Sequence, residues 1–235
     1  MLHDISRPSS RLLLSQRWFA ALPADEQTRI AGTVSTLRGT KGDVMLRAGE
    51  QVQGWYAVLS GLVKLQSKSS HGRRSAYLGI PGGEWFGEGA AMKDEPRRYD
   101  VIALRDSELL CLPVAEFAQL RATSMAFNHA LADQLNMRLG QAMAIIETMR
   151  LRTPEQRVAM YLGRHLWHGP RKMSLSQEEL GVLAGLSRQT VNAALKSLEQ
   201  QGLVALEFGR VSILDDGGLM ALALKPEPGA ADDAD

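Results

Sequence analysis

The pattern of apolar and polar positions changes character twice along this chain of 235 residues. Residues 16–35 have a helical pattern, with Pro23 near a helix start and acidic residues just after it. Between residues 37 and 112, short β-prone apolar runs recur between turns rich in glycine, aspartate and serine. Regular short strands of this kind predict a β-barrel or sandwich. From Pro113 onward the pattern is helical again.

Two helices are predicted directly after the β-rich region, a short one at 113–123 and a long one at 124–152. Apolar residues in the long helix recur at alternating steps of three and four, as in a coiled-coil seam. The residues assigned to this dimerisation seam are Leu135, Leu139, Ala142, Ile146 and Met149. The same pattern also fits a helix that packs on its own domain, so both interpretations stay open. A new helix is then predicted at Thr153, with Pro154 in its first turn.

Residues 174–214 predict a helix, a tight turn, a second helix and a short β-hairpin. Ser176 and the glutamate three residues later form a capping box at the first helix. Gly185 supplies the small residue that a turn between two helices needs, and Ser187 caps the second helix. The whole segment therefore reads as a winged helix-turn-helix.

The second helix of this segment has two chemically distinct faces. Its apolar face carries Val191, Ala194, Leu195 and Leu198, and its polar face carries Arg188, Gln189, Asn192 and Lys196. Arginine reads guanine, glutamine and asparagine read adenine, and lysine neutralises phosphate, so the polar face predicts a recognition helix in a DNA major groove. The expected DNA contacts come from Ser176, Gln177, Ser187, Arg188, Gln189, Thr190, Asn192, Lys196 and Arg210.

Composition changes this picture little. The formal net charge is +1, so no global basic character marks a nucleic-acid binder. The single cysteine, Cys111, lies in an apolar run, which excludes an intramolecular disulfide or a cysteine cluster and predicts a strand thiol in the core. No apolar stretch is as long as a membrane span, and the first residues lack the features of a signal peptide. We therefore expect a cytoplasmic protein with no membrane partner.

Over about residues 18–214 the chain resembles the cAMP receptor protein/FNR family of transcription factors. The resemblance rests on the strand-glycine-strand stretch at 59–64, the start of a phosphate-binding cassette at 81–88 and the recognition-helix segment at 186–191. It implies an α+β fold: an N-terminal double-stranded β-helix (a cyclic-nucleotide-binding-like β-barrel), a long dimerisation helix and a C-terminal winged helix-turn-helix. It also implies a homodimer that binds two-fold symmetric, double-stranded promoter DNA and contacts RNA polymerase.

The resemblance and the pattern together divide the chain into five parts. We predict a flexible N-terminal arm at 1–15, a sensor barrel at 16–123, the dimerisation helix at 124–152, the winged helix-turn-helix at 153–218 and an acidic C-terminal tail at 219–235.

The cassette residues make chemical sense as an anion site. Gly87 and Gly89 allow backbone N–H groups to approach an anion closely, and Glu88 can accept a hydrogen bond from a ribose hydroxyl. Arg98 can pair with a cyclic phosphate through two hydrogen bonds. The alternative is a plain β-turn with surface arginines. The candidate effector-binding residues are Gly87, Glu88, Gly89, Arg97, Arg98, Tyr99, Ala142 and Met143.

Several positions depart from the cyclic-AMP-binding members of the family. Tyr99 stands where those members have a serine or threonine after the cassette arginine, and Ala142 and Met143 stand where they place hydroxyl side chains near adenine. Each unpaired polar group would cost about 1–3 kcal/mol. A cyclic nucleotide therefore stays open as a ligand but is disfavoured for tight binding, against a different ligand or none. The cofactor is unknown from the sequence.

Two other sensing chemistries of the family are tested by residue counts. An FNR-type iron–sulfur cluster needs several cysteines, and this chain has one. Haem needs an axial ligand in the barrel, where His71 is the only histidine and lies in a predicted exposed hairpin tip. The sequence thus excludes the cluster and argues against haem.

The recognition helix departs from the family as well. Many members carry a glutamate after the first arginine and a second arginine four residues later, where this chain has Gln189 and Ala193. We expect Arg188 still to read a guanine and the inner bases of the half-site to differ from the common family consensus.

We predict a homodimeric, sequence-specific DNA-binding transcriptional regulator, an activator as is commoner in the family, whose barrel can take a small effector. One alternative is an effector-independent regulator controlled by its own abundance. Another, a cyclic-nucleotide-binding regulatory module of an enzyme, is disfavoured because few residues remain for a catalytic domain. No P-loop, Ser-His-Asp spacing or metal cluster is present in the sequence, so no catalytic activity is expected.

Overall fold

The computed structural model describes residues 8–68, 74–151, 153–163, 175–207 and 210–225, with side chains for all of these except residues 68, 74–77, 147–151 and 210. The chain divides into two compact units, Met1–Met137 and Arg138–Asp235, and each unit is described by itself. In the described residues no helix is long and apolar enough to cross a membrane.

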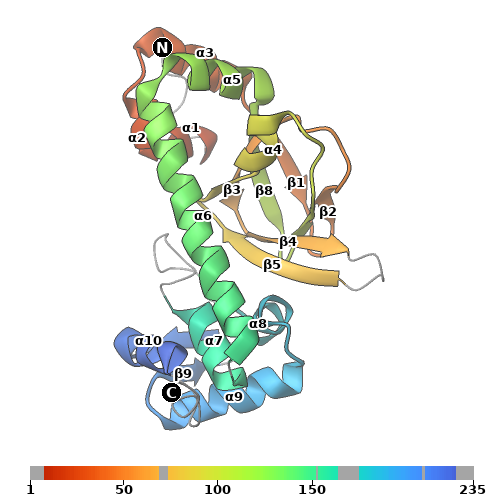
Figure 1. The fold of residues 1–235 in the computed structure, drawn as a ribbon, viewed down its shortest axis with the longest axis vertical. Helices are drawn as coiled ribbons and strands as arrows, with labels where there is room; N and C mark the ends of the chain where they lie inside the picture. The colour runs from red at the N-terminus through yellow and green to blue at the C-terminus, as the bar shows by residue number, and fades with distance from the viewer. Residues whose placement is uncertain (1–7, 69–73, 152, 164–174, 208–209, 226–235) are drawn as a thin grey trace, which may run out of the picture. The chain divides into compact units, whose positions relative to one another are not determined.

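The first unit is a β roll with helices (Figure 1). Its helices are α1 (Pro8–Ser15), α2 (Arg17–Ala20), α3 (Ala24–Thr33), α4 (Glu88–Lys93) and α5 (Val114–Thr123). Its strands are β1 (Ser35–Gly39), β2 (Val44–Leu46), β3 (Gly54–Ser60), β4 (Leu62–Lys68), β5 (Arg74–Pro81), β6 (Trp85–Phe86), β7 (Asp100–Ala103) and β8 (Ser107–Pro113). They form two four-stranded antiparallel sheets, β1-β8-β3-β6 and β2-β7-β4-β5. The predicted fold class is confirmed, with two sheets in place of a closed barrel.

The alternation of side chains along β3 gives the first sheet two different faces. Trp55 and Ala57 belong to a hydrophobic cluster that includes residues of the helices. Tyr56 and Val58 point to the opposite face because successive side chains of a strand alternate. Tyr56 lies opposite Cys111 on β8 and opposite Phe86 on β6. This second face matters for the candidate site, because it carries Tyr56, the ring that Arg97 contacts.

An aromatic cluster joins the helices to the first sheet. The rings of Trp55 and Trp85 stack at 4.2 Å between centroids, and Trp18 and Phe127 meet edge to face at 5.0 Å. Leu13 of α1 is also fully buried in this cluster. The predicted flexible arm at 1–15 is therefore wrong for residues 8–15, which form a helix anchored by its apolar side chain; residues 1–7 lie outside the described part.

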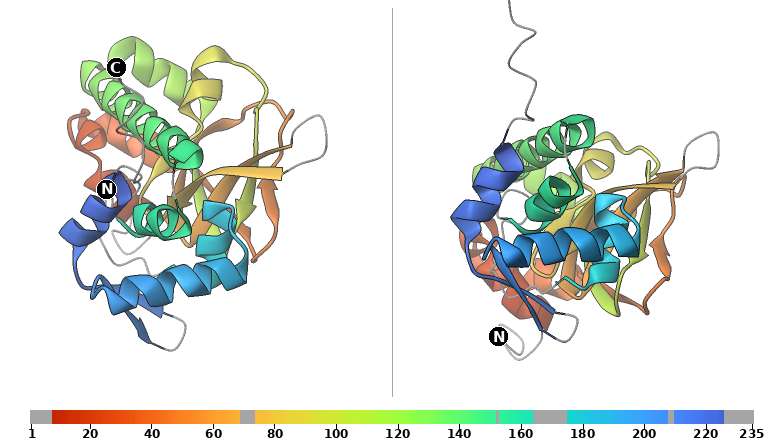
Figure 2. Two further views of the ribbon diagram at one scale, coloured as in Figure 1. Left: turned by 60° about the horizontal axis from the view of Figure 1, so that its bottom comes forward. Right: turned by 90° about the horizontal axis from the view of Figure 1, so that it is seen from below.

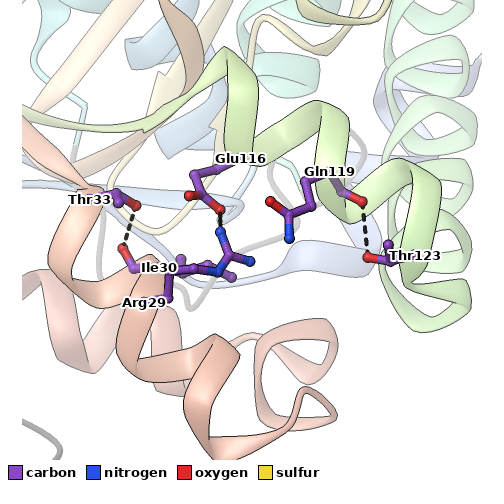
Figure 3. A network of polar contacts seen from close by, with 6 residues as sticks. All are labelled: Arg29, Ile30, Thr33, Glu116, Gln119 and Thr123. Carbon is purple, nitrogen blue, oxygen red and sulfur yellow. Dashed lines mark hydrogen bonds and ion pairs between the residues drawn. The ribbon is translucent and has the colours of Figure 1, made fainter.

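An ion pair links α3 to α5 at the same end of the unit. Figure 3 shows Arg29 of α3 reaching the carboxylate of Glu116 on α5, with Gln119 one turn further along α5. The two side chains are only partly exposed, so the pair is less screened by water than a fully exposed one. It adds a polar contact to the apolar packing of these helices.

Gly61 fills the turn between β3 and β4 for a steric reason. Its φ is +95°, and a Cβ there would lie 2.2 Å from the hydroxyl oxygen of Ser107. No other residue fits this position without moving β8, because both the left-handed backbone and the close approach require glycine. This glycine is the centre of the strand-glycine-strand motif.

The long helix α6 (Met125–Leu151) crosses the boundary between the units, so it begins in the first unit and ends in the second. The other elements of the second unit are α7 (Pro154–Leu162), α8 (Gln177–Ala184), α9 (Arg188–Gln200), β9 (Val204–Glu207), β10 (Arg210–Ile213) and α10 (Asp216–Leu224). The predicted caps are confirmed: Thr153 caps α7 and Ser176 caps α8, each in a capping box. Gly185 ends α8 in the left-handed region, as the turn requires.

The predicted acidic tail at 219–235 is wrong for its first residues. Residues up to Leu224 form α10, whose Leu219 and Ala223 are buried. Its end is held by the amide of Gln156 on α7, which donates to the carbonyl of Leu222 at 3.3 Å and of Lys225 at 2.8 Å. The folded unit therefore runs past 218, and residues 226–235 lie outside the described part.

Candidate functional site

The recognition helix α9 is seated by a buried apolar face. Val191, Ala194, Leu195 and Leu198 are completely buried, as their spacing predicts. At the start of the helix the Ser187 hydroxyl accepts a hydrogen bond from the Thr190 amide at 3.1 Å. The β-hairpin lies beside α9, as both ribbon views show (Figures 1 and 2). Packing and cap together fix the rotation of α9 about its own axis.

That rotation leaves the polar face open. The side chains of Arg188, Gln189 and Lys196 are exposed and that of Asn192 is half-exposed. Among the described residues, none of these four side chains makes a hydrogen bond or an ion pair. The donors and acceptors that direct base reading needs are therefore unused in the folded chain. Gln177, at the first position of α8, is half-exposed as well.

Three of the predicted DNA contacts also have structural roles. The Ser176 hydroxyl accepts from the Glu179 amide at 3.2 Å, so it serves first as the cap of α8. The hydroxyls of Ser187 and Thr190 lie 2.8 Å apart in the cap of α9. The side chain of Arg210, the predicted wing contact, lies outside the described part of the structure.

The wing is fixed to the recognition helix. β9 and β10 pair antiparallel from Val204 with Ile213 to Glu207 with Arg210. The carboxylate of Glu199, near the end of α9, accepts a hydrogen bond from the Leu206 amide at 2.9 Å. Helix and hairpin are therefore held together through this side chain as well as through the backbone.

The predicted seam forms an exposed apolar stripe on α6. Leu139 is 60% exposed and Ile146 is 57% exposed, and Leu135 and Ala142 are exposed as well. Met143, on the same side of the helix, is 63% exposed. The side chain of Met149 lies outside the described part. Large apolar side chains exposed in a row are unfavourable in water, so this stripe is available to a partner surface.

The cassette brings together a glycine, a buried carboxylate and a buried guanidinium. Gly87 has a φ of +90° and precedes α4, whose first residue is Glu88. The Oε2 atom of Glu88 is buried and accepts no hydrogen bond from any described residue. Arg97 is 4% exposed, and its Nη1 atom is likewise buried without a hydrogen-bonding partner among the described residues. A Cβ placed on Gly87 would lie 3.5 Å from this Nη1, so the guanidinium faces the glycine.

The backbone around Arg97 is held by the turn at residues 47–50. The Gly49 amide donates to the Arg97 carbonyl at 2.7 Å, and the Arg97 amide donates to the Glu50 carbonyl at 2.9 Å. Three residues on, the Asp100 carboxylate accepts from the Ala48 amide at 2.9 Å. These bonds fix where the Arg97 side chain begins, and hence its entry into the interior of the roll.

The geometry favours Arg97 over Arg98 as the anion-binding arginine. The Arg98 side chain is 74% exposed and pairs with Glu95 at 2.8 Å. Arg98 is therefore a surface arginine, as the alternative of a plain β-turn with surface arginines predicts. Arg97, in contrast, points to Gly87. Gly89 is exposed in α4, and Tyr99 is half-buried on the approach to β7. Ala142 and Met143 belong to the second unit, so the structure does not place them relative to the cassette.

Two residues that contact the cassette region were not predicted from the sequence. Tyr56 on β3 lies under Arg97, with 5.1 Å between the guanidinium carbon and the ring centroid. Gln134 on α6 donates from Nε2 to the carbonyl of Trp85 at 2.6 Å, and thereby ties α6 to the strand that leads into Gly87. Neither contact has a local sequence signal, because each joins residues that are distant in the chain.

The interior of the roll also holds the thiol of Cys111. Burial raises the pKa of this thiol above its ordinary value, against the opposing effects of the Tyr56 hydroxyl and of the nearby Arg97 charge. The predicted strand location is confirmed, with partial rather than full burial. Among the described residues no group of histidine, cysteine and acidic side chains is placed to hold a metal ion.

We expect Cys111 to react slowly with thiol reagents near neutral pH. A raised pKa leaves less thiolate at pH 8 than in a free thiol, and the rate should keep increasing at pH values above the ordinary thiol pKa, where that of the unfolded chain levels off. The measurement is the rate of reaction with a chromogenic disulfide reagent between pH 7 and 10, with the urea-unfolded chain as the control. A folded chain that reacts as fast as the unfolded one at pH 8 would contradict this expectation.

These features define a class of protein: a β roll followed by a long helix and a winged helix-turn-helix whose second helix has an exposed polar face. A model of the cyclic nucleotide-binding domain matches residues 37–124, and a model of the Crp-like helix-turn-helix domain matches residues 156–222. The chain belongs to the Crp/Fnr family of transcriptional regulators, and it is a DNA-binding regulator and not an enzyme.

Individual relatives agree with this assignment. The chain is 29% identical over 184 residues to the cyclic AMP receptor protein of Thermus thermophilus, covering 78% of this chain and 85% of the relative. It is 26% identical over 204 residues to the HTH-type transcriptional regulator Cmr of Mycobacterium tuberculosis, covering 87% and 82%. The solved structure of FixK2 from Bradyrhizobium japonicum has the same fold, with a TM-score of 0.68 at 18% identity over 83% of this chain and 100% of that one.

Proposed function

We propose that this protein is a homodimeric transcriptional activator whose affinity for promoter DNA is set by a small anionic effector in the β roll. The observation that carries the effector is Arg97, a buried guanidinium that faces Gly87 and has no counter-ion among the described residues. A buried charge is stable only when it is compensated, and a bound anion would supply that compensation. A cytoplasmic location follows from the role, because promoter DNA is reached there.

The dimer is proposed from the stripe on α6. Leu139 and Ile146 lie at seam positions seven residues apart, and each leaves more than half of its surface in water. Two copies of the helix would cover each other's stripe in coiled-coil fashion. A dimer would present two copies of α9, and a two-fold symmetric DNA site would match them. Contact with RNA polymerase at such a site is the proposed route to activation.

The side chains of the cassette indicate which chemical groups an effector would carry. An oxyanion would pair with Arg97, and a hydroxyl or N–H group of the ligand would donate to the free Oε2 of Glu88. Cyclic AMP is not the preferred candidate. With Arg97 as the anion-binding arginine, the next residue is the exposed Arg98, which offers no hydroxyl, and Ala142 and Met143 offer none from α6.

The proposed control is a shift between two arrangements of the dimer. An effector that bound one arrangement better would raise its population by no more than its difference in affinity allows. Gln134 gives the cassette a direct hydrogen bond to α6, through which occupancy of the site could bias the helix. The alternative of an effector-independent regulator differs only in that nothing fills the roll.

Calorimetric titration with cyclic AMP and with cyclic di-GMP tests the proposal first. For any ligand that binds, we expect Arg97→Leu to abolish measurable binding, because the ion pair to the oxyanion is lost. Arg98→Ala should change the affinity by less than about threefold, since exposed charges contribute little. Equal losses in the two variants would contradict the assignment of Arg97. DNA affinity that is indifferent to Arg97→Leu and to both nucleotides would favour the effector-independent alternative.

A further inference from the structure

The counterpart of the Arg97 charge in the folded chain is an aromatic ring. The guanidinium carbon lies 5.1 Å from the centroid of Tyr56, within the range of a cation–π contact. No described carboxylate lies within ion-pair distance of this guanidinium, and no described residue accepts a hydrogen bond from it. Since the side chain is only 4% exposed, little water reaches the guanidinium, and the ring is the contact that the structure shows for it.

Tyr56 is itself held rigidly. Its backbone pairs with Phe86 on one side and Cys111 on the other, in the middle of the first sheet. Its ring stacks on that of Phe86 at 5.9 Å between centroids with 24° between the planes. Tyr56 pairs across the strands with Cys111, whose thiol influences the hydroxyl. A ring held by its strand and by the stack on Phe86 offers one defined surface on which a guanidinium can lie.

This surface determines which edge of Arg97 is left without a hydrogen-bonding partner among the described residues. A guanidinium is flat and carries its N–H donors in its plane. The Tyr56 ring occupies one side of Arg97, while Nη1 faces Gly87, where the absent Cβ would have lain 3.5 Å away. An oxyanion can approach that edge and accept two parallel hydrogen bonds.

We propose that Tyr56 is a positioning residue, which holds the Arg97 guanidinium on its ring so that the free Nη1 edge faces Gly87 and receives an oxyanion. The inference rests on the proposed effector site and adds to it a residue that prepares the arginine before any ligand arrives. Its ligand is defined by the shared chemistry of phosphate and carboxylate groups. A flexible arginine would lose more conformational freedom on binding, so a held one binds more tightly.

The first test needs no ligand. Full-length protein is treated with phenylglyoxal, an arginine-specific reagent, and the modification rate of Arg97 is followed by peptide mass spectrometry. We expect Tyr56→Leu to raise this rate by about 30-fold, the factor for loss of a desolvated cation–π contact. Tyr56→Phe keeps the ring and should stay close to wild type. Val58→Ala, which removes buried volume from the same face of β3, is the matched control.

Two results would overturn the proposal. One is a modification rate of Arg97 that does not rise in Tyr56→Leu. The other is an equal rise in Val58→Ala, since general loosening of the fold would then explain the effect. Circular dichroism checks that each variant folds, and Tyr56→Met replaces Tyr56→Leu if the latter does not fold.

The second test uses the calorimetric titrations with cyclic AMP and cyclic di-GMP. For a nucleotide that binds, Tyr56→Leu should weaken affinity at least about tenfold and Tyr56→Phe by less than about threefold. Equal losses in both variants would overturn the role of the ring. If neither nucleotide binds the wild type, that result excludes these two nucleotides as the effector, and the modification rate of Arg97 still tests the role of Tyr56.

Discussion

Replacing Arg188 with alanine should weaken binding to the protein's own DNA site by about 1–3 kcal/mol for each half-site, the worth of a bidentate contact to guanine. Arg188 lies at the first position of α9, exposed and without a partner among the described residues, so its loss should leave the fold intact. Fluorescence anisotropy on a duplex selected from a random library measures the effect, at a stated salt concentration.

Two further variants of α9 separate the reading of bases from the contribution of charge to DNA binding. Lys196→Ala should weaken binding to all sequences alike and reduce the salt dependence, because lysine contacts phosphate. Gln200→Ala, an exposed residue near the other end of α9, serves as the neutral control. If Arg188→Ala weakened specific and random DNA equally, direct reading of a guanine would be refuted. A scan of single-base changes that returned the common family consensus would refute the altered half-site expected from Gln189 and Ala193.

Replacing Leu139 with glutamate should dissociate the proposed dimer, with a rise in its dissociation constant of about 100-fold or more. Each buried leucine contributes about 1.5–3 kcal/mol, and the substitution enters the interface twice. Sedimentation velocity measures the change, and affinity for a two-half-site duplex should fall with it. Asp133→Lys, also exposed on α6 but off the seam, tests whether any charge change on the helix has the same effect.

The comparison of Leu139 with Asp133 decides between the two readings of the stripe. A monomeric Leu139→Glu protein and a dimeric Asp133→Lys protein would support the coiled-coil seam. A dimer that survives Leu139→Glu would mean that the stripe does not hold the two copies together.

Local patterns allowed the DNA-binding unit to be predicted almost completely. Capping boxes, the glycine turn and the amphipathic pattern of α9 each depend on residues within about one helical turn, so the sequence displays them directly. The helix α10 was missed because its apolar residues, such as Leu219, were counted with the acidic residues that follow. Its partner on α7 is distant in the chain, and distant packing leaves no periodic trace.

Sequence spacing alone did not identify the arginine that enters the roll. Spacing from Glu88 suggested Arg98, but the chain turns at Asp94, whose φ is +51°, and the Arg97 backbone hydrogen-bonds to the turn at residues 47–50. These non-local contacts decide which of two adjacent arginines enters the roll. Tyr56 could not be assigned for the same reason, because only the pairing of β3 with β6 and β8 brings its ring to the cassette.

The aromatic cluster gives the protein an intrinsic fluorescent probe. Three of its four tryptophans, Trp18, Trp55 and Trp85, share one buried environment. Trp85 stacks on Trp55 and stands two residues before Gly87, and its carbonyl receives the bond from Gln134. Indole emission responds to changes in stacking and polarity, so intrinsic fluorescence should report movement of the cassette strand without any attached dye. Libraries of metabolites can therefore be screened by emission alone.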